Sequence, residues 1–373
     1  MNMNEKINIA KALGMILVVA AHSCGPAYVT RFSYLLCVSI FFVCAGYCFN
    51  TKYLDDQTTF VKKRFKGIYL PFWKWSVFFL VFNHLWFYTG ILSEKFGNSA
   101  GGVQHPLSFK AGLQALWSIT FNMSGYDQFL CGAYWFFRAF FVASLMWILV
   151  MSVLNSMKFL KQKFTVAASI VAIGALGLAV LHCEFGLKMT GVAQGGYREL
   201  MGLFFFAFGF IARRLLGKRS EYNAIKCLSE HRNICTLTAF AAVILIVCFN
   251  PVAMDIRAKN VLSVFVLALS GIVGFVFLVG LSGLIERYSH EKVKKVFLYI
   301  GKNTLYIFGF HFFAFKLVSM AKVLYYGLEW QYIGGHPVVI SECGRWWWII
   351  YLIVGISVPL VVTHLLRKLK KTQ

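Results

Sequence analysis

The chain has 373 residues, of which 59% are hydrophobic and 17% are aromatic, and its mean hydropathy is +0.68. These values lie above the usual range of soluble domains and predict an all-α polytopic membrane protein, with consecutive spans packed as a single domain over 1–373. A net charge of +23 is compatible with nucleic-acid binding, but the basic residues fall in alternate loops between apolar runs. This pattern indicates membrane topology, so we expect no nucleic-acid partner.

Ten apolar runs of membrane-spanning length follow one another along the chain. They lie near 7–23, 32–50, 68–90, 131–155, 164–183, 198–216, 232–250, 260–284, 297–324 and 346–368. Between the third and fourth runs, the amphipathic segment from Leu107 to Met123 predicts an interfacial or re-entrant helix. The sequence therefore predicts a bundle of about ten transmembrane helices. Its ten cysteines include no CxxC pair, and no metal site is expected.

The positions of the basic residues predict the orientation of the chain. If the N-terminus is cytoplasmic, the cytoplasmic loops and both tails hold 24 lysines and arginines, whereas the outer loops hold about eight. The positive-inside rule therefore places both termini in the cytoplasm. The basic surface is also expected to attract anionic lipid of the bilayer or a polyanionic cytoplasmic ligand.

The first apolar run contains two ionisable residues, Lys11 and His22. Eleven residues are about three helical turns, so the two side chains point to nearly the same side of a helix, roughly 16 Å apart along its axis. Ionisable groups inside a bilayer are costly and usually serve a function. The structural alternative is that Lys11 reaches the headgroups at one interface and His22 lies at the other.

Five stretches along the chain carry further motifs. They are KALGMILVVAAH at 11–22, SIFFVCAGYCF at 39–49, VKKRFKGIYLPFW at 61–73, AYWFFRAFF at 133–141 and IGKNTLYIFGFHFF at 300–313. In this order they resemble the acyltransferase-3 family of integral membrane O-acyltransferases, particularly its sugar O-acetylase-like branch. Lys11 and His22 match the family's basic residue and histidine, and Arg64 matches its arginine. Lys11 replaces the commoner arginine, which removes the bidentate fork but keeps the charge.

The resemblance implies an acyl-CoA-dependent O-acyltransferase of the bacterial inner membrane. An acyl group, most often acetyl from cytoplasmic acetyl-CoA, would move to a hydroxyl of a cell-envelope saccharide or a related acceptor. Lys11, Lys63 and Arg64 would hold the phosphates of CoA, and the thioester would extend along the first helix towards His22. His22 would act as the general base, or alternatively form a transient acyl-histidine.

Four other residues are candidates for binding substrate or supporting the site: Trp135, Arg138, His311 and His84. Each also has a structural explanation, because Trp135 suits a membrane interface, Arg138 can pair with a neighbouring helix, and both histidines can pack in apolar surroundings. Likewise Lys63 and Arg64 suit a cytoplasmic loop without any ligand. No motif supplies a carboxylate to orient His22.

The alternative function is a transporter or exporter of an envelope saccharide or its precursor, since ten spans with buried polar residues suit that role as well. The chain shows no inverted repeat and no matched pair of broken helices, which disfavours the transporter. No pattern in the sequence specifies the acceptor, the acyl chain or the oligomeric state.

Overall fold

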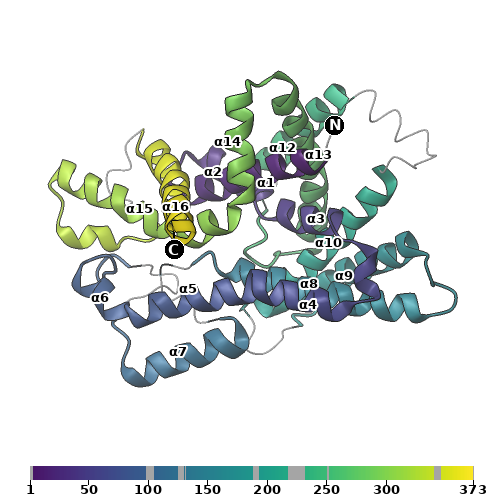
Figure 1. The fold of residues 1–373 in the computed structure, drawn as a ribbon, viewed down its shortest axis with the longest axis horizontal. Coiled ribbons are helices and arrows are strands. Elements are labelled where there is room, and N and C mark those ends of the chain that lie inside the picture. The colour runs from purple at the N-terminus through teal and green to yellow at the C-terminus, as the bar shows by residue number, and fades with distance from the viewer. Residues whose placement is uncertain are drawn as a thin grey trace. The chain divides into compact units, whose positions relative to one another are not determined.

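The computed structural model describes residues 3–97, 105–124, 130, 132–187, 193–216, 232–249, 252–339 and 346–372. These residues form helices and no strand (Figure 1). Six helical segments among them are long and apolar enough to cross a membrane, and a further apolar helix, Asn233–Phe249, is shorter. The prediction of an all-α polytopic membrane protein is therefore confirmed.

The helices follow one another in this order. The first half of the chain contains α1 (Met3–His22), α2 (Ala27–Leu36), α3 (Ser39–Tyr47), the 3-10 helix η1 (Thr51–Leu54), α4 (Gln57–Arg64), the π-helical turn η2 (Phe65–Tyr69), α5 (Leu70–Val81), α6 (Asn83–Tyr88), α7 (Phe109–Asn122), α8 (Trp135–Ser156) and α9 (Phe164–Glu184). The second half contains η4 (Ala193–Gly196), α10 (Tyr197–Leu216), α12 (Arg232–Phe249), α13 (Val261–Tyr288), α14 (Glu291–Lys302), α15 (Thr304–Tyr326), η5 (Trp330–Gly334) and α16 (Trp347–Thr372).

Three of the ten expected spans contain a break in their helix, although Ala27–Tyr47, which covers most of the run 32–50, is still one candidate span. The run 32–50 is divided into α2 and α3, and the run 68–90 begins in the π-helical turn and is divided after α5. The run 297–324 is interrupted at Asn303, whose φ of −116° and ψ of 17° leave helical geometry. An apolar run indicates that a segment can cross the membrane. It does not show whether the helix is continuous, because a local departure from helical dihedrals can break the helix within an apolar run. The amphipathic helix expected from Leu107 to Met123 is present as α7.

Contacts between residues divide the chain into two compact units. Unit 1 comprises Met1–Gly14, Arg31–Ile68 and Arg138–Lys302, and unit 2 comprises Met15–Thr30, Tyr69–Phe137 and Asn303–Gln373. Helix α1 therefore contributes its first part to unit 1 and its last part to unit 2. A single domain over the whole chain stays a prediction.

In unit 1, α10 packs closely against α3 and α9, and α12 packs against α13. Two glycines make the crossing of α3 and α10 possible. A Cβ atom on Gly46 would lie 1.8 Å from the carbonyl oxygen of Phe206, and one on Gly209 would lie 2.0 Å from that of Val43. Small residues at such crossings let the two backbones approach, which is how membrane helices gain packing contacts.

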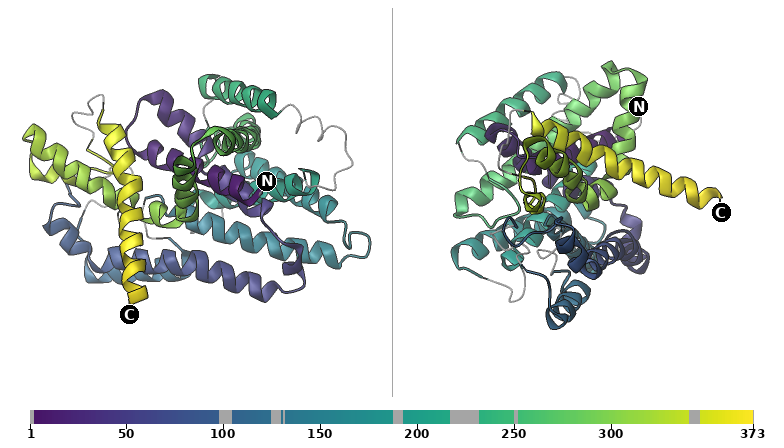
Figure 2. Two further views of the ribbon diagram at one scale, coloured as in Figure 1. Left: turned by 45° about the horizontal axis from the view of Figure 1, so that its top comes forward. Right: turned by 90° about the vertical axis from the view of Figure 1, so that its left-hand side faces the viewer.

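In unit 2, α15 packs against α16, and α5 packs against α7. Residues 364–369 of α16 are exposed, and Figure 2 shows this helix at the C-terminal end of the chain. Trp73 Nε1 of α5 donates to Thr120 Oγ1 at 3.1 Å, and Tyr69, which precedes α5, donates to the carbonyl oxygen of Thr120 at 2.6 Å. Polar contacts therefore hold α7 against the start of α5.

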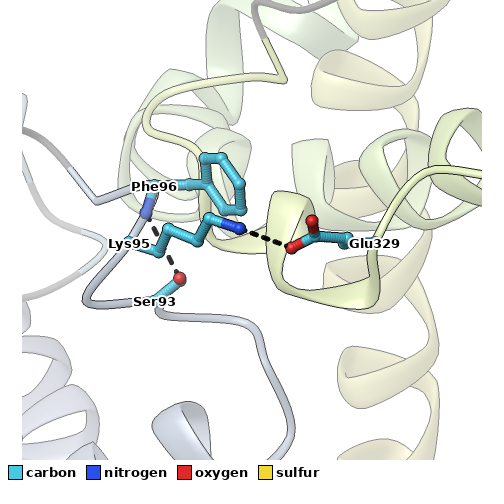
Figure 3. Close-up of polar contacts among 4 residues, drawn as sticks. All are labelled: Ser93, Lys95, Phe96 and Glu329. Atoms are coloured by element: carbon cyan, nitrogen blue, oxygen red, sulfur yellow. Dashed lines mark hydrogen bonds and ion pairs between the residues drawn. The ribbon is translucent and has the colours of Figure 1, made fainter.

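Two loops of unit 2 are joined at the surface. Lys95 Nζ lies 2.7 Å from Glu329 Oε2, and the backbone N–H of Phe96 donates to Ser93 Oγ at 3.3 Å (Figure 3). The ring of Phe96 stacks on that of Tyr332, with 3.8 Å between centroids. These contacts connect the segment after α6 with η5.

Candidate active site

Three histidines and one phenylalanine come together in unit 2, and we call them the histidine group: His22, His311, Phe312 and His336. The ring centroids of His22 and His311 are 5.6 Å apart, and His22 packs edge-on against Phe312 at 4.9 Å. The ring centroids of His336 and Phe312 are 4.9 Å apart. The end of α1, the middle of α15 and the segment after η5 thus supply one imidazole each.

The hydrogen bonds of His311 fix which ring nitrogen carries its proton. His311 Nδ1 lies 2.9 Å from the carbonyl oxygen of Phe308 and 3.2 Å from that of Ile307. Carbonyl oxygens only accept, so we assign the proton of the neutral ring to Nδ1. His311 Nε2 is then an acceptor, and it is buried without a hydrogen-bond partner among the described residues. It offers a lone pair beside His22.

Lys316, one turn beyond His311 on α15, holds the segment that carries His336. Its ammonium is buried and donates to the carbonyl oxygens of Ile333 at 2.8 Å and Gly335 at 2.7 Å. Burial, followed by the charge of Lys316 and by His311, lowers the pKa of His336 to about 3. The imidazole of His336 is therefore neutral at physiological pH.

Three cations of unit 1 act together on the thiol of Cys48, which follows α3, and we call Lys11, Arg64 and Arg213 the cationic group. Arg213 comes from the last turn of α10, and its Nη1 donates to the carbonyl oxygens of Tyr47 at 3.2 Å and Phe49 at 3.1 Å. These bonds satisfy carbonyls at the end of α3 and hold the guanidinium beside Cys48.

Arg64 is placed by aromatic rings. Its guanidinium carbon lies 4.8 Å from the ring centroid of Phe60 and 5.5 Å from that of Phe140. Burial lowers the pKa of Arg64 to about 10, which leaves the group charged at neutral pH. The arrangement positions a fixed positive charge at low conformational cost.

The other predicted residues lie elsewhere. Lys63 is exposed and donates to the hydroxyl of Tyr53 at 2.9 Å, so its role in donor binding stays a prediction. His84 is also exposed, and its Nε2 lies 2.9 Å from the carbonyl oxygen of Leu107. Trp135 begins α8 and is half-buried. Arg138 pairs with Glu199 of α10, with 3.6 Å between Nε and Oε1, which confirms the expected pairing with a neighbouring helix.

In the structure Lys11 and Arg64 both act electrostatically on the thiol of Cys48, and His22 lies beside His311. Sequence reasoning did not select Arg213, Lys316 or His336. Lys316 gave a signal, because a lysine inside an apolar run is expensive and therefore informative. Arg213 gave none beyond its contribution to the basic loops.

An acyltransferase domain family, Acyl_transf_3, matches residues 4–364. No curated protein matches the chain, and no solved structure does. The matched region includes every residue of the histidine group and of the cationic group. Because the match covers nearly the whole length and the described helices include membrane-spanning segments, this chain belongs to the acyltransferase-3 family and is a membrane acyltransferase.

Proposed function

We propose that the protein transfers an acyl group, acetyl in the first instance, from cytoplasmic acyl-CoA to a hydroxyl of a cell-envelope saccharide or related acceptor. The observation that carries the proposal is that one helix, α1, supplies Lys11 to the cationic group and His22 to the histidine group. The first group suits the phosphates of a CoA donor, and the second suits proton transfer.

His22 is the general base of the proposed reaction. It takes the proton of the acceptor hydroxyl as that oxygen attacks the thioester carbonyl, and the tetrahedral intermediate then expels CoA as a thiolate. The proton on His22 passes to the thiolate, so the products are the ester and CoA. The unpartnered Nε2 of His311 supports this assignment, because an acceptor beside His22 can bind a neighbouring hydroxyl of the saccharide while the attacking hydroxyl donates to His22. An acyl-histidine on His22 is the covalent variant.

The cationic group binds the donor. Lys11, Arg213 and Arg64 all act electrostatically on the thiol of Cys48, and Lys63 lies next to Arg64 in sequence. Guanidinium and ammonium groups form charge-assisted hydrogen bonds with phosphate, and together they form a site for a polyanion. CoA carries its negative charges at the nucleotide end, which this group would hold.

The proposed orientation follows from the distribution of charge. With both termini in the cytoplasm of a bacterial inner membrane, Lys11 lies nearer the cytoplasmic end of α1 and His22 nearer the outer end. Donor and acceptor then approach from opposite faces of the bilayer. The sugar O-acetylase-like motifs favour a saccharide acceptor.

The base is tested with His22→Ala in membrane vesicles supplied with labelled acetyl-CoA and a crude envelope saccharide fraction. Transfer of label should fall to background, while His364→Ala, which removes an exposed histidine of α16, should leave transfer intact. Comparable transfer by the His22→Ala protein, at equal folded amount, would refute the role of His22.

The donor site is tested by the affinity for acetyl-CoA. Lys11→Ala and Arg213→Ala should each raise the KM for acetyl-CoA by on the order of tenfold, because each removes a charge-assisted contact. Arg214→Ala is the matched control, since its guanidinium lies over the rings of Phe164 and Phe210 instead. Equal KM values for Arg213→Ala and Arg214→Ala would contradict the proposed donor site.

A further inference from the structure

A second polar cluster lies in unit 1, where three helices end. Arg138 is in the first turn of α8, His182 is in the last turn of α9, and Glu199 is in the first turn of α10. Arg138 and Glu199 form the ion pair described above, and their side chains are 14% and 9% exposed. His182 is buried and acts electrostatically on Glu199. We call these residues the helix-end group.

Each member of the helix-end group has one buried polar atom without a hydrogen-bond partner among the described residues: Arg138 Nη1, Glu199 Oε2 and His182 Nδ1. His182 Nε2 lies 2.9 Å from the carbonyl oxygen of Gly195, so this nitrogen carries the proton and Nδ1 is an acceptor. The group therefore presents one charged donor and two acceptors. Leaving three such atoms unsatisfied in a buried site is expensive, so each of them is available to bind a polar group.

Residues on either side of the start of α10 are held in place beside the group. The backbone N–H of Arg257 donates to Gln194 Oε1 at 2.9 Å, and Arg198 Nε donates to the carbonyl oxygen of Asp255 at 2.7 Å. Both contacts connect residues beside Gly195 and Glu199 to the segment before α13. The helix-end group is thus fixed by its surroundings before any ligand arrives.

The three helix ends share one face of the membrane. Helices α8 and α9 are consecutive spans, so the start of α8 and the end of α9 are on the same side, and α10 starts where α9 ends. With the orientation proposed above, this side is the outer one. That is the side from which the acceptor approaches.

The chemistry of the group selects a neutral ligand rich in hydroxyls. Arg138 and Glu199 cancel each other in charge. Arg198, which also acts on Glu199, is offset by Asp255, so neither an anion nor a cation gains a net attraction. A hydroxyl can accept from Arg138 Nη1 and donate to Glu199 Oε2, and a neighbouring hydroxyl can donate to His182 Nδ1. We propose that Arg138, His182 and Glu199 form a saccharide subsite that binds hydroxyls of the acceptor. This inference rests on the proposed function for the saccharide class.

Binding is measured without the reaction, by saturation-transfer NMR on the purified full-length protein in a detergent that lacks a sugar headgroup. The probes are a panel of methyl hexosides. The variants are Glu199→Gln and His182→Gln, which keep the side-chain size and change the donor and acceptor pattern. Arg138 is left in place, because its removal would strand a buried carboxylate. Glu184→Gln is the control, since it changes an exposed acid at the end of α9.

Wild type and Glu184→Gln should bind at least one hexoside saturably, and Glu199→Gln and His182→Gln should bind it more weakly by on the order of tenfold. The affinity for CoA, measured on the same samples, should be equal in all four proteins. Equal CoA affinity would show that the variants are folded. Absence of saturable binding to wild type, or equal hexoside affinity in wild type and Glu199→Gln, would overturn the subsite and assign the three atoms to buried water.

Acyl transfer by the same preparations separates this inference from the proposed function. Hexoside binding that depends on Glu199, without any transfer by wild type, would refute the acetyl transfer and leave the subsite standing. Transfer by wild type with an unchanged acceptor KM in Glu199→Gln would refute the subsite alone.

Discussion

Gly46→Ala tests the crossing of α3 and α10, on which the cationic group depends. The added methyl carbon would lie 1.8 Å from the carbonyl oxygen of Phe206, whereas ordinary van der Waals contact begins at 3.4 Å. The two backbones must therefore separate by about 1.6 Å, and no side-chain rotation can relieve this contact. Overpacking of this kind typically lowers the free energy of unfolding by ~1–3 kcal/mol. A loss of ~3 kcal/mol lowers the Tm by roughly 4 °C in a chain of this length.

The same shift should weaken donor binding, because Arg213 on α10 holds the carbonyls of Tyr47 and Phe49 at the end of α3. The assay is the Tm in detergent together with the KM for acetyl-CoA. Gly174→Ala is the control, since Gly174 is exposed on α9 with no atom within 4 Å of its added carbon. A Gly46→Ala protein as stable as Gly174→Ala would refute the close crossing.

Three further predictions concern unit 2. Burial and Lys316 hold the pKa of His336 near 3, against an ordinary value near 6.5. The contribution of neutral His336 to the free energy of unfolding is therefore complete above pH 6.5 and is lost as the pH falls towards 3. The drop in Tm from pH 7.5 to pH 5 should be smaller in His336→Gln than in wild type. Lys316→Met should speed hydrogen exchange over 329–335, because two carbonyls lose their donor; unchanged exchange would show that other contacts hold this segment. His84→Ala should retain acyl transfer, since the side chain is exposed and bonded to Leu107, and a large loss would return His84 to the site.

Many of the helices were predictable because a membrane-spanning helix is a long run of apolar residues, which is visible in the sequence. The long apolar runs near α8, α9, α10, α13 and α16 begin and end within a few residues of their predicted bounds. The interruptions were not predictable in the same way. Asn303 lies in the polar stretch 302–304, which marks the place of the break, but the run around it is apolar enough to predict one span. The division between α5 and α6 falls among aromatic residues that suit either side.

The candidate site was predictable where the chemistry is local to one helix. The spacing of Lys11 and His22 is a property of α1 alone, so the sequence was sufficient to select them. The residues that complete each group come from distant segments. Arg213 is more than 200 residues from Lys11 in the chain, and His336 follows a separate helix. Contacts between such residues depend on packing, which periodicity does not describe.

Helix α1 continues without a break from Met3 to His22, so its length fixes how far the donor must extend between the two proposed sites. The distance between the proposed phosphate site and the proposed base is set by the number of residues between Lys11 and His22, at 1.5 Å of rise for each. One extra residue would lengthen that distance only slightly but would turn His22 by about 100° around the axis. The direction in which the imidazole points therefore depends on the number of residues before it. An insertion or deletion between Lys11 and His22 would remove the base from the site even though His22 itself is retained.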